Sequence, residues 1–294
     1  MIRLLRAALR HVLGYGLVVP AILGQIAAQA MVFGPMGNRT TLPRLIYRLA
    51  GAIFSVRFVL NPASTPFSAD RPTLFLSNHL SRLDFAGLHL FPDVAILMNA
   101  MFFRMPVFGP VIRLFARSAG LIGTEQTQAG KRRDQLALAQ AVDQGRNLFV
   151  FAEGIQTDGR RVLRYSQGAA EILYDPTLLA AFPALSRVQV QPVVYRVRAI
   201  EGEEMLQAPE KWGRYTLSRG RSSIFAGMSR LTLTGSIIID VLVCPPLLPA
   251  DFPDAAALVG AAHDIARRLI APDQARTLTR GEWKRRLDTR DFSL

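Results

Sequence analysis

The sequence predicts an α/β fold: a mixed, mostly parallel sheet flanked by helices, with an N-terminal membrane-associated helical segment. Short apolar runs bounded by turn residues alternate with stretches of helical spacing, which is typical of a sheet covered on both faces. Polar side chains gather where these runs end, and such sheets bind ligands at the carboxyl ends of their strands. An uncharged segment, Val12–Gly34, precedes all of them.

The charge and hydrophobicity of the chain indicate which kind of partner it binds. The 294 residues include 35 Lys and Arg against 22 Asp and Glu, a net charge of +13, and half of them are hydrophobic. A chain that is both basic and apolar favours an anionic membrane surface over nucleic acid as partner. The single cysteine, Cys244, excludes an internal disulfide, and its apolar surroundings predict a small buried side chain.

The N-terminal segment is long enough to cross a bilayer core, which needs about 20 residues. Both of its flanks are positively charged, so the positive-inside rule does not choose an orientation. We therefore expect a segment that dips into the membrane or lies in its interface, with a buried core helix as the other interpretation. The chain then divides into this segment, residues 1–50, and an α/β catalytic domain, residues 51–294. The flanking arginines are Arg3, Arg6, Arg10, Arg39, Arg44 and Arg48.

Three elements open the predicted domain. Residues Arg44–Leu60 read as a helix that runs into a strand, followed by a loop rich in Pro, Ser and Asp. The apolar run Thr73–Asn78 is short and ends in a turn, which indicates a buried strand. Residues 81–91 have helical spacing, with two leucines and a glycine on one face, and Ser81 is a plausible N-cap.

The remaining elements continue the alternation. Prolines and a glycine break residues 102–120 into a turn and a helix, and an amphipathic helix follows that Gly145 closes. The second apolar run, Asn147–Gly154, predicts a buried strand that ends in a carboxylate. Beyond it we expect a short helix (167–175), two strands (188–197 and 236–247), a late helix (254–271) and a basic tail (280–292).

The residues behind the first buried strand carry the candidate chemistry. His79 follows the strand and Asp84 comes five positions later. Since the chain reverses there, the carboxylate can return to one imidazole nitrogen, fix the tautomer and leave the other nitrogen as a base. This arrangement activates a hydroxyl, here one that belongs to the substrate. Asn78 can brace the turn.

Four motifs in order resemble the glycerolipid acyltransferases typified by 1-acyl-glycerol-3-phosphate acyltransferase. The first, N-H-x-S-x-x-D, is Asn78, His79, Ser81 and Asp84. The second is Arg104 with P-x-F-G (Pro106–Gly109), the third is "FAEGIQTDGRR", and the fourth is the strand "VQPVVY" with Pro192. Order and spacing agree from about residue 71 to 198.

The resemblance implies acyl transfer from acyl-CoA or acyl carrier protein to a lipid hydroxyl, without cofactor, metal or covalent enzyme intermediate. His79 would be the general base and Asp84 its orienter. Glu153 and Gly154 would bind the polar head of the acceptor, and Pro192 would shape the acyl pocket. The full set expected to bind substrate is Asn78, Ser81, Arg82, Arg104, Gly109, Glu153, Gly154, Gln156 and Pro192.

The chain also departs from the family pattern. The third motif usually continues with threonine and arginine, where this chain has Ile155 and Gln156, and Glu125 stands where the second motif has an arginine. Glutamine does not replace a bidentate guanidinium. Arg160, Arg161 and Arg164 follow the motif as other sources of charge. We favour an acceptor that is not a simple phosphomonoester, such as a lyso-ornithine lipid.

Three alternatives stay open. Lysophosphatidic acid is the first, as acceptor in phosphatidic acid synthesis. The second is a catalytically weak family member that binds lipid and serves as a scaffold. A degenerate site usually loses one residue of the histidine–aspartate pair, whereas this chain keeps both His79 and Asp84. A nucleic-acid binder fits the charge but explains none of the motifs. We expect the cytoplasmic face of a bacterial inner membrane as location. The sequence leaves open the acceptor, the donor carrier, the acyl length, the oligomeric state and whether residues 12–34 span or dip.

Overall fold

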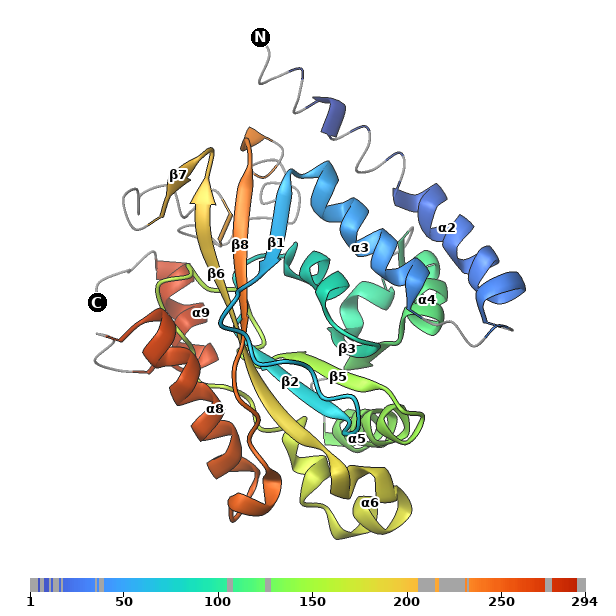
Figure 1. Cartoon of the computed structure of the whole chain (residues 1–294), viewed down its shortest axis with the longest axis vertical. Helices are drawn as coiled ribbons and strands as arrows, with labels where there is room; N and C mark the ends of the chain where they lie inside the picture. Colours follow the sequence, from blue (N-terminus) through green and yellow to red (C-terminus); the bar gives the residue numbers. More distant parts are fainter. Residues whose placement is uncertain are drawn as a thin grey trace.

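One twisted sheet lies between two groups of helices (Figure 1). The computed structural model describes residues 5, 8–10, 12, 16, 18–34, 36, 40–104, 108–124, 128–205, 215–216, 231, 233–272 and 277–289. The described helices are α2 (Val18–Ala28), η1 (Gln29–Phe33), α3 (Thr41–Ile53), η2 (Asp84–Leu90), η3 (Ala100–Arg104), α4 (Phe108–Ala119), α5 (Gln128–Asp143), η4 (Ala170–Leu173), α6 (Pro176–Ala181), η5 (Pro183–Arg187), η7 (Pro249–Asp251), α8 (Ala255–Ile270) and α9 (Arg280–Thr289).

The sheet has eight strands in the order β1-β8-β6-β2-β5-β3-β4, with β7 paired to β6. Among the described strands only the pairs β6–β8 and β6–β7 are antiparallel, so the predicted mixed, mostly parallel sheet is confirmed. The two apolar runs predicted as buried strands, β2 and β5, are adjacent at its centre. The strands are β1 (Val56–Leu60), β2 (Thr73–Ser77), β3 (Val94–Asn99), β4 (Leu121–Thr124), β5 (Asn147–Phe151), β6 (Gln189–Ile200), β7 (Glu203–Glu204) and β8 (Ile237–Val243).

Each face of the sheet carries its own core, because successive side chains of a strand point to opposite faces. Phe75 of β2 and Phe149 of β5 face α3, η2 and α4, and their rings are 6.1 Å apart. Leu74 and Leu148 face the other way, toward α5, α6 and α8. All four side chains are fully buried, as strands covered on both sides require.

Four elements differ from the prediction. Within residues 81–91 the described helix is the 3-10 helix η2 (Asp84–Leu90) instead of an α-helix, since Asp84 N–H donates to Ser81 O and Ala86 N–H to Leu83 O. Leu83 is its N-cap, in place of Ser81. The short strands β3 and β4 lie in stretches that had no assignment. In the described part of the basic tail, Arg280–Thr289 forms the helix α9, whose Trp283 is fully buried.

The N-terminal segment packs on the domain where it is described. The helix α2 lies on α3 and α4, and Ile22 and Ile26 join the core on that face of the sheet (Figure 1). Gln25 and Gln29, which interrupt the apolar run, are buried. Among the described residues, no helix is both long and apolar enough to cross a membrane. The division into residues 1–50 and 51–294 stays a prediction.

Candidate active site

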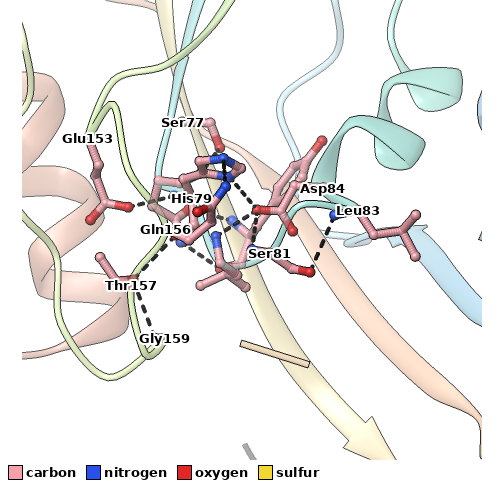
Figure 2. Close-up of polar contacts among 12 residues, drawn as sticks. Ser77, His79, Ser81, Leu83, Asp84, Glu153, Gln156, Thr157 and Gly159 are labelled. Atoms are coloured by element: carbon pink, nitrogen blue, oxygen red, sulfur yellow. Dashed lines mark hydrogen bonds and ion pairs between the residues drawn. The ribbon is translucent and has the colours of Figure 1, made fainter. Parts of the chain in front are cut away.

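The candidate site lies where β2 and β5 end. Because these parallel neighbours have Ser77 and Phe151 as Cα partners, the segments that follow leave the same edge of the sheet. One segment carries the first motif and the other carries the third. Figure 2 shows the side chains of both segments converging on His79.

His79 and Asp84 form the predicted pair. Nδ1 of His79 lies 2.8 Å from Oδ2 of Asp84, which is fully buried, whereas the imidazole is 15% exposed. The same oxygen accepts the backbone N–H groups of Leu80 at 2.6 Å and Ser81 at 2.9 Å. Since a carboxylate held by N–H donors only accepts, Nδ1 carries the proton and Nε2 presents its lone pair.

The second oxygen of Asp84 has a partner that the sequence did not predict. The hydroxyl of Tyr215 donates to Oδ1 at 2.7 Å. Burial, followed by the charge of Asp84, raises the pKa of Tyr215 well above its usual value, so the hydroxyl keeps its proton. The two residues are 131 positions apart, and no spacing signal in the chain connects them.

Glu153 holds the backbone of the site. Its Oε2 accepts the N–H of His79 at 2.6 Å and its Oε1 that of Leu163 at 2.7 Å. Burial raises the pKa of this carboxyl well above its usual value, and the two backbone donors lower it. The side chain thus fixes the turn that presents the imidazole. Its predicted contact with the acceptor head would have to displace these bonds.

The other ring nitrogen of His79, Nε2, faces Gln156. Nε2 of the amide lies 2.9 Å from Nε2 of the imidazole, to which it donates. The ring of Phe151 stacks on the imidazole with 4.4 Å between centroids. Thr157 completes the frame from the same loop, because its N–H donates to the carbonyl oxygen of His79 at 2.8 Å. These contacts hold the imidazole in one orientation, with Asp84 at one ring nitrogen and Gln156 at the other.

The other first-motif residues surround the pair. Asn78 is fully buried, and its amide bonds both backbone groups of Tyr195 in β6, at 2.8 and 3.0 Å. It therefore ties the turn that carries His79 to the neighbouring strand β6, which is the bracing contact that the sequence suggested. The hydroxyl of Ser81 accepts the N–H of Leu83 at 3.3 Å. Arg82 follows it and is half-buried.

Residues of the second and fourth motifs lie in the elements around the His79 turn. A Cβ on Gly109 would lie 2.5 Å from the carbonyl oxygen of Phe103, so glycine lets α4 approach η3. Arg104, at the end of η3, is exposed. Pro192 is buried in β6 as the Cα partner of Leu76, one strand from the base.

Pro106 and Glu125 of the second motif lie outside the described residues, as do the flanking arginines Arg3, Arg6 and Arg39. Within the described part of the chain, no group of three or more His, Cys, Asp or Glu side chains is placed to hold a metal ion.

A comparison with protein families finds a match over more than half of the chain. The model of the family named Acyltransferase matches residues 39–196, which include the His79–Asp84 pair, Glu153 and Gln156.

Two similar proteins and one solved structure are also named acyltransferases. A lyso-ornithine lipid O-acyltransferase from Brucella abortus (strain 2308) is 25% identical over 240 residues, 80% of this chain and 83% of that protein. Another of the same name, from Rhodobacter capsulatus, is 29% identical over 163 residues, 54% and 52% of the two chains. The crystal structure of the 1-acyl-sn-glycerophosphate (LPA) acyltransferase PlsC from Thermotoga maritima shares the fold, with TM-score 0.61, 15% identity and coverage of 93% and 97%.

Proposed function

The chain belongs to the acyltransferase family, and from that premise we propose that it moves a fatty acyl group from a thioester to the hydroxyl of a lyso-lipid. The donor is acyl-CoA or acyl carrier protein. The observation that carries the proposal is the His79–Asp84 pair: Nδ1 lies 2.8 Å from the buried carboxylate, and Nε2 accepts the amide of Gln156, which a substrate hydroxyl can replace. A degenerate scaffold would have no need to keep that frame.

His79 acts as the general base. Its Nε2 takes the proton of the acceptor hydroxyl while the oxygen attacks the thioester carbonyl carbon. The C–S bond then breaks, and the imidazolium returns the proton to the departing thiolate, which yields an ester and a free thiol. Asp84 keeps Nδ1–H oriented throughout and stabilises the imidazolium that forms.

Gln156 changes partner during this step. In the described structure its amide occupies the lone pair of Nε2, so the acceptor hydroxyl must take its place. A neutral hydrogen bond of this kind contributes only about 1 kcal/mol net, and the displaced amide gains a partner if it turns to the acceptor head. Gln156 would then contact the acceptor directly, in keeping with its place in the set expected to bind substrate.

A lyso-lipid with an amino-acid head, such as a lyso-ornithine lipid, is the acceptor we favour. Both curated relatives above carry that name, and a neutral amide stands beside the base in this chain. Lysophosphatidic acid is the competing acceptor, and the solved Thermotoga maritima enzyme that shares the fold is named for it.

The enzyme would work at the cytoplasmic face of a bacterial inner membrane, where a lyso-lipid and a soluble thioester meet. The net charge of +13 supports an anionic surface as partner. The large apolar side chains that are exposed on α2, η1 and α3 support the same partner.

An acyl-transfer assay on the full chain in detergent tests the function. Labelled acyl-CoA and acyl carrier protein are each offered with lyso-ornithine lipid, lysophosphatidic acid and a lysophospholipid with a zwitterionic head. We expect transfer to lyso-ornithine lipid and its loss in His79→Ala, with an unchanged circular dichroism spectrum. Robust turnover of lysophosphatidic acid, with no turnover of the other lyso-lipids, would contradict lyso-ornithine lipid as the acceptor. Absence of transfer to every lyso-lipid would favour the scaffold.

A further inference from the structure

The helix α9 is attached to the loop of the third motif. Trp283 is fully buried, and its indole N–H donates to the backbone oxygen of Gln156 at 3.0 Å. Ile155 packs against Trp283 and Leu278, and the carbonyl oxygen of Leu278 accepts the N–H of Arg164 at 2.9 Å. A segment far along the chain therefore holds the residues beside the base.

The start of α9 is fixed as well. Thr279 and Glu282 form a capping box: Oε2 of Glu282 accepts the Thr279 N–H at 2.7 Å, and the Thr279 hydroxyl accepts the Glu282 N–H at 3.2 Å. The helix consequently begins at one residue, Arg280, whose side chain is half-buried.

The guanidinium of Arg280 lies over Gly154. A Cβ on this glycine would be 3.0 Å from Nη1, so a side chain there would press on the guanidinium. Gly154 is exposed and has a φ of +66°, in the left-handed region that glycine adopts without strain. The glycine of the third motif thus leaves room for an arginine that comes from a different element.

Gly154 lies between two residues that contact His79. Gly154 directly follows Glu153, which binds the N–H of His79, and it precedes Gln156, which bonds Nε2, by two positions. The neighbouring Arg161 pairs with Asp158 at 2.7 Å and lies over the Trp283 ring at 5.3 Å.

We propose that Arg280 binds the anionic group of the acceptor head and so determines which lyso-lipid is used. The proposal rests on the lyso-lipid function above. A guanidinium presents a planar fork of donors that matches a carboxylate or a phosphate with two parallel bonds. Where the family motif has an arginine this chain has Gln156, and Arg280 supplies a guanidinium to the same loop from α9.

Steady-state kinetics of four proteins test this role: wild type, Arg280→Gln, Arg280→Lys and Lys284→Gln. The last variant removes one positive charge from an exposed position of the same helix. The acceptors are lyso-ornithine lipid, its carboxyl methyl ester and lysophosphatidic acid, each with saturating donor. Circular dichroism and thermal unfolding establish that the variants fold.

We expect Arg280→Gln to raise the KM for lyso-ornithine lipid about tenfold or more, with kcat and donor KM within about twofold. The KM of Arg280→Lys should lie between those of wild type and Arg280→Gln, because lysine keeps the positive charge but lacks the planar pair of donors. The methyl ester should be a poor acceptor for wild type and show no further loss in Arg280→Gln. An effect confined to lysophosphatidic acid would identify the bound anion as a phosphate.

Equal acceptor KM values in Arg280→Gln and Lys284→Gln, for every acceptor, would overturn the role of Arg280 while leaving the proposed reaction intact. If wild type transfers no acyl group, the reaction fails, and calorimetric binding of lyso-ornithine lipid in micelles then decides about Arg280. Weaker binding by Arg280→Gln than by Lys284→Gln supports it, and equal binding excludes it.

Discussion

At the scale of single residues, the carboxylate of Asp84 organises the site. Three N–H donors, from His79, Leu80 and Ser81, converge on one oxygen, and Tyr215 donates to the other. A fully buried carboxylate needs such partners, because an unpaired buried charge costs several kcal/mol. The same bonds prevent rotation of the group, so the imidazole of His79 keeps one orientation.

Replacement of Asp84 by asparagine tests the charge of this group. The amide keeps the volume, and the backbone N–H groups of Leu80 and Ser81 hold its oxygen toward Nδ1, but it carries no negative charge to stabilise the imidazolium that forms. We expect kcat to fall about 10³- to 10⁴-fold with the acceptor KM little changed. The measurement is kcat for the preferred acceptor, with thermal unfolding as a folding control. A loss of less than about tenfold would mean that Asp84 only stabilises the turn.

The first motif could be predicted at this scale because its residues are close in sequence and the turn between strand and helix is short. Tyr215 could not, since its contact with Asp84 arises only when the whole domain is packed. Cys244 was correctly predicted as a buried hydrophobe: it is 3% exposed, and burial raises the pKa of its thiol to about 11.

At the scale of elements, the charged end of the chain behaves differently from its sequence pattern. The many charges of residues 280–292 suggested a tail, yet one apolar side chain, Trp283, anchors α9. The T-x-x-E pattern of Thr279 and Glu282 was the local signal that a helix begins there. In α8, which was predicted correctly, His263 lies among apolar residues and is 8% exposed.

His263 makes the stability of α8 depend on pH. Burial lowers its pKa below the usual 6.5, although the nearby Asp264 raises it. The folded chain therefore takes up this proton less readily than the unfolded chain. The free energy of unfolding is unaffected by this group above about pH 6.5 and decreases as the pH falls from there toward the lowered pKa.

The variant His263→Gln isolates this contribution. Thermal unfolding of wild type and variant is measured at pH 7.5 and at pH 5.5. Carboxylates titrate in both proteins, so the quantity of interest is the decrease in Tm between the two pH values. We expect a smaller decrease in the variant. An equal decrease would show that His263 is solvated in the folded chain.

At the scale of the whole molecule, the two sides of the sheet present different surfaces. The helices α2, α3 and α4 lie together on one side, with α5 and α8 on the other (Figure 1). Arg48 and Arg113 are exposed on the first side. Cationic and apolar groups together suit the interface of an anionic membrane. The large apolar side chains exposed there are Leu23, Met31, Val32, Leu45, Leu49 and Leu114.

Vesicle binding tests this surface. The double variant Leu45→Glu with Leu49→Glu changes two exposed positions one turn apart on α3 and should leave the core intact. We expect partition onto vesicles rich in phosphatidylglycerol to weaken at least about tenfold, with Tm unchanged. The control is Leu269→Glu, 42% exposed on α8, which should bind as wild type does. An equal loss of vesicle binding in the double variant and in Leu269→Glu would contradict a lipid-binding surface on the α3 side of the sheet.

The pairing of β1 has a consequence for biosynthesis. Within the described sheet this edge strand bonds only to β8, and the register joins Val56 to Ile237. At about 5 to 20 residues per second, a ribosome needs roughly 10 to 40 s to make the chain between them. Until then β1, which follows α3, lacks the strand with which it pairs in the described sheet. The nascent chain thus offers its most apolar region to nearby lipid well before the domain can close behind it.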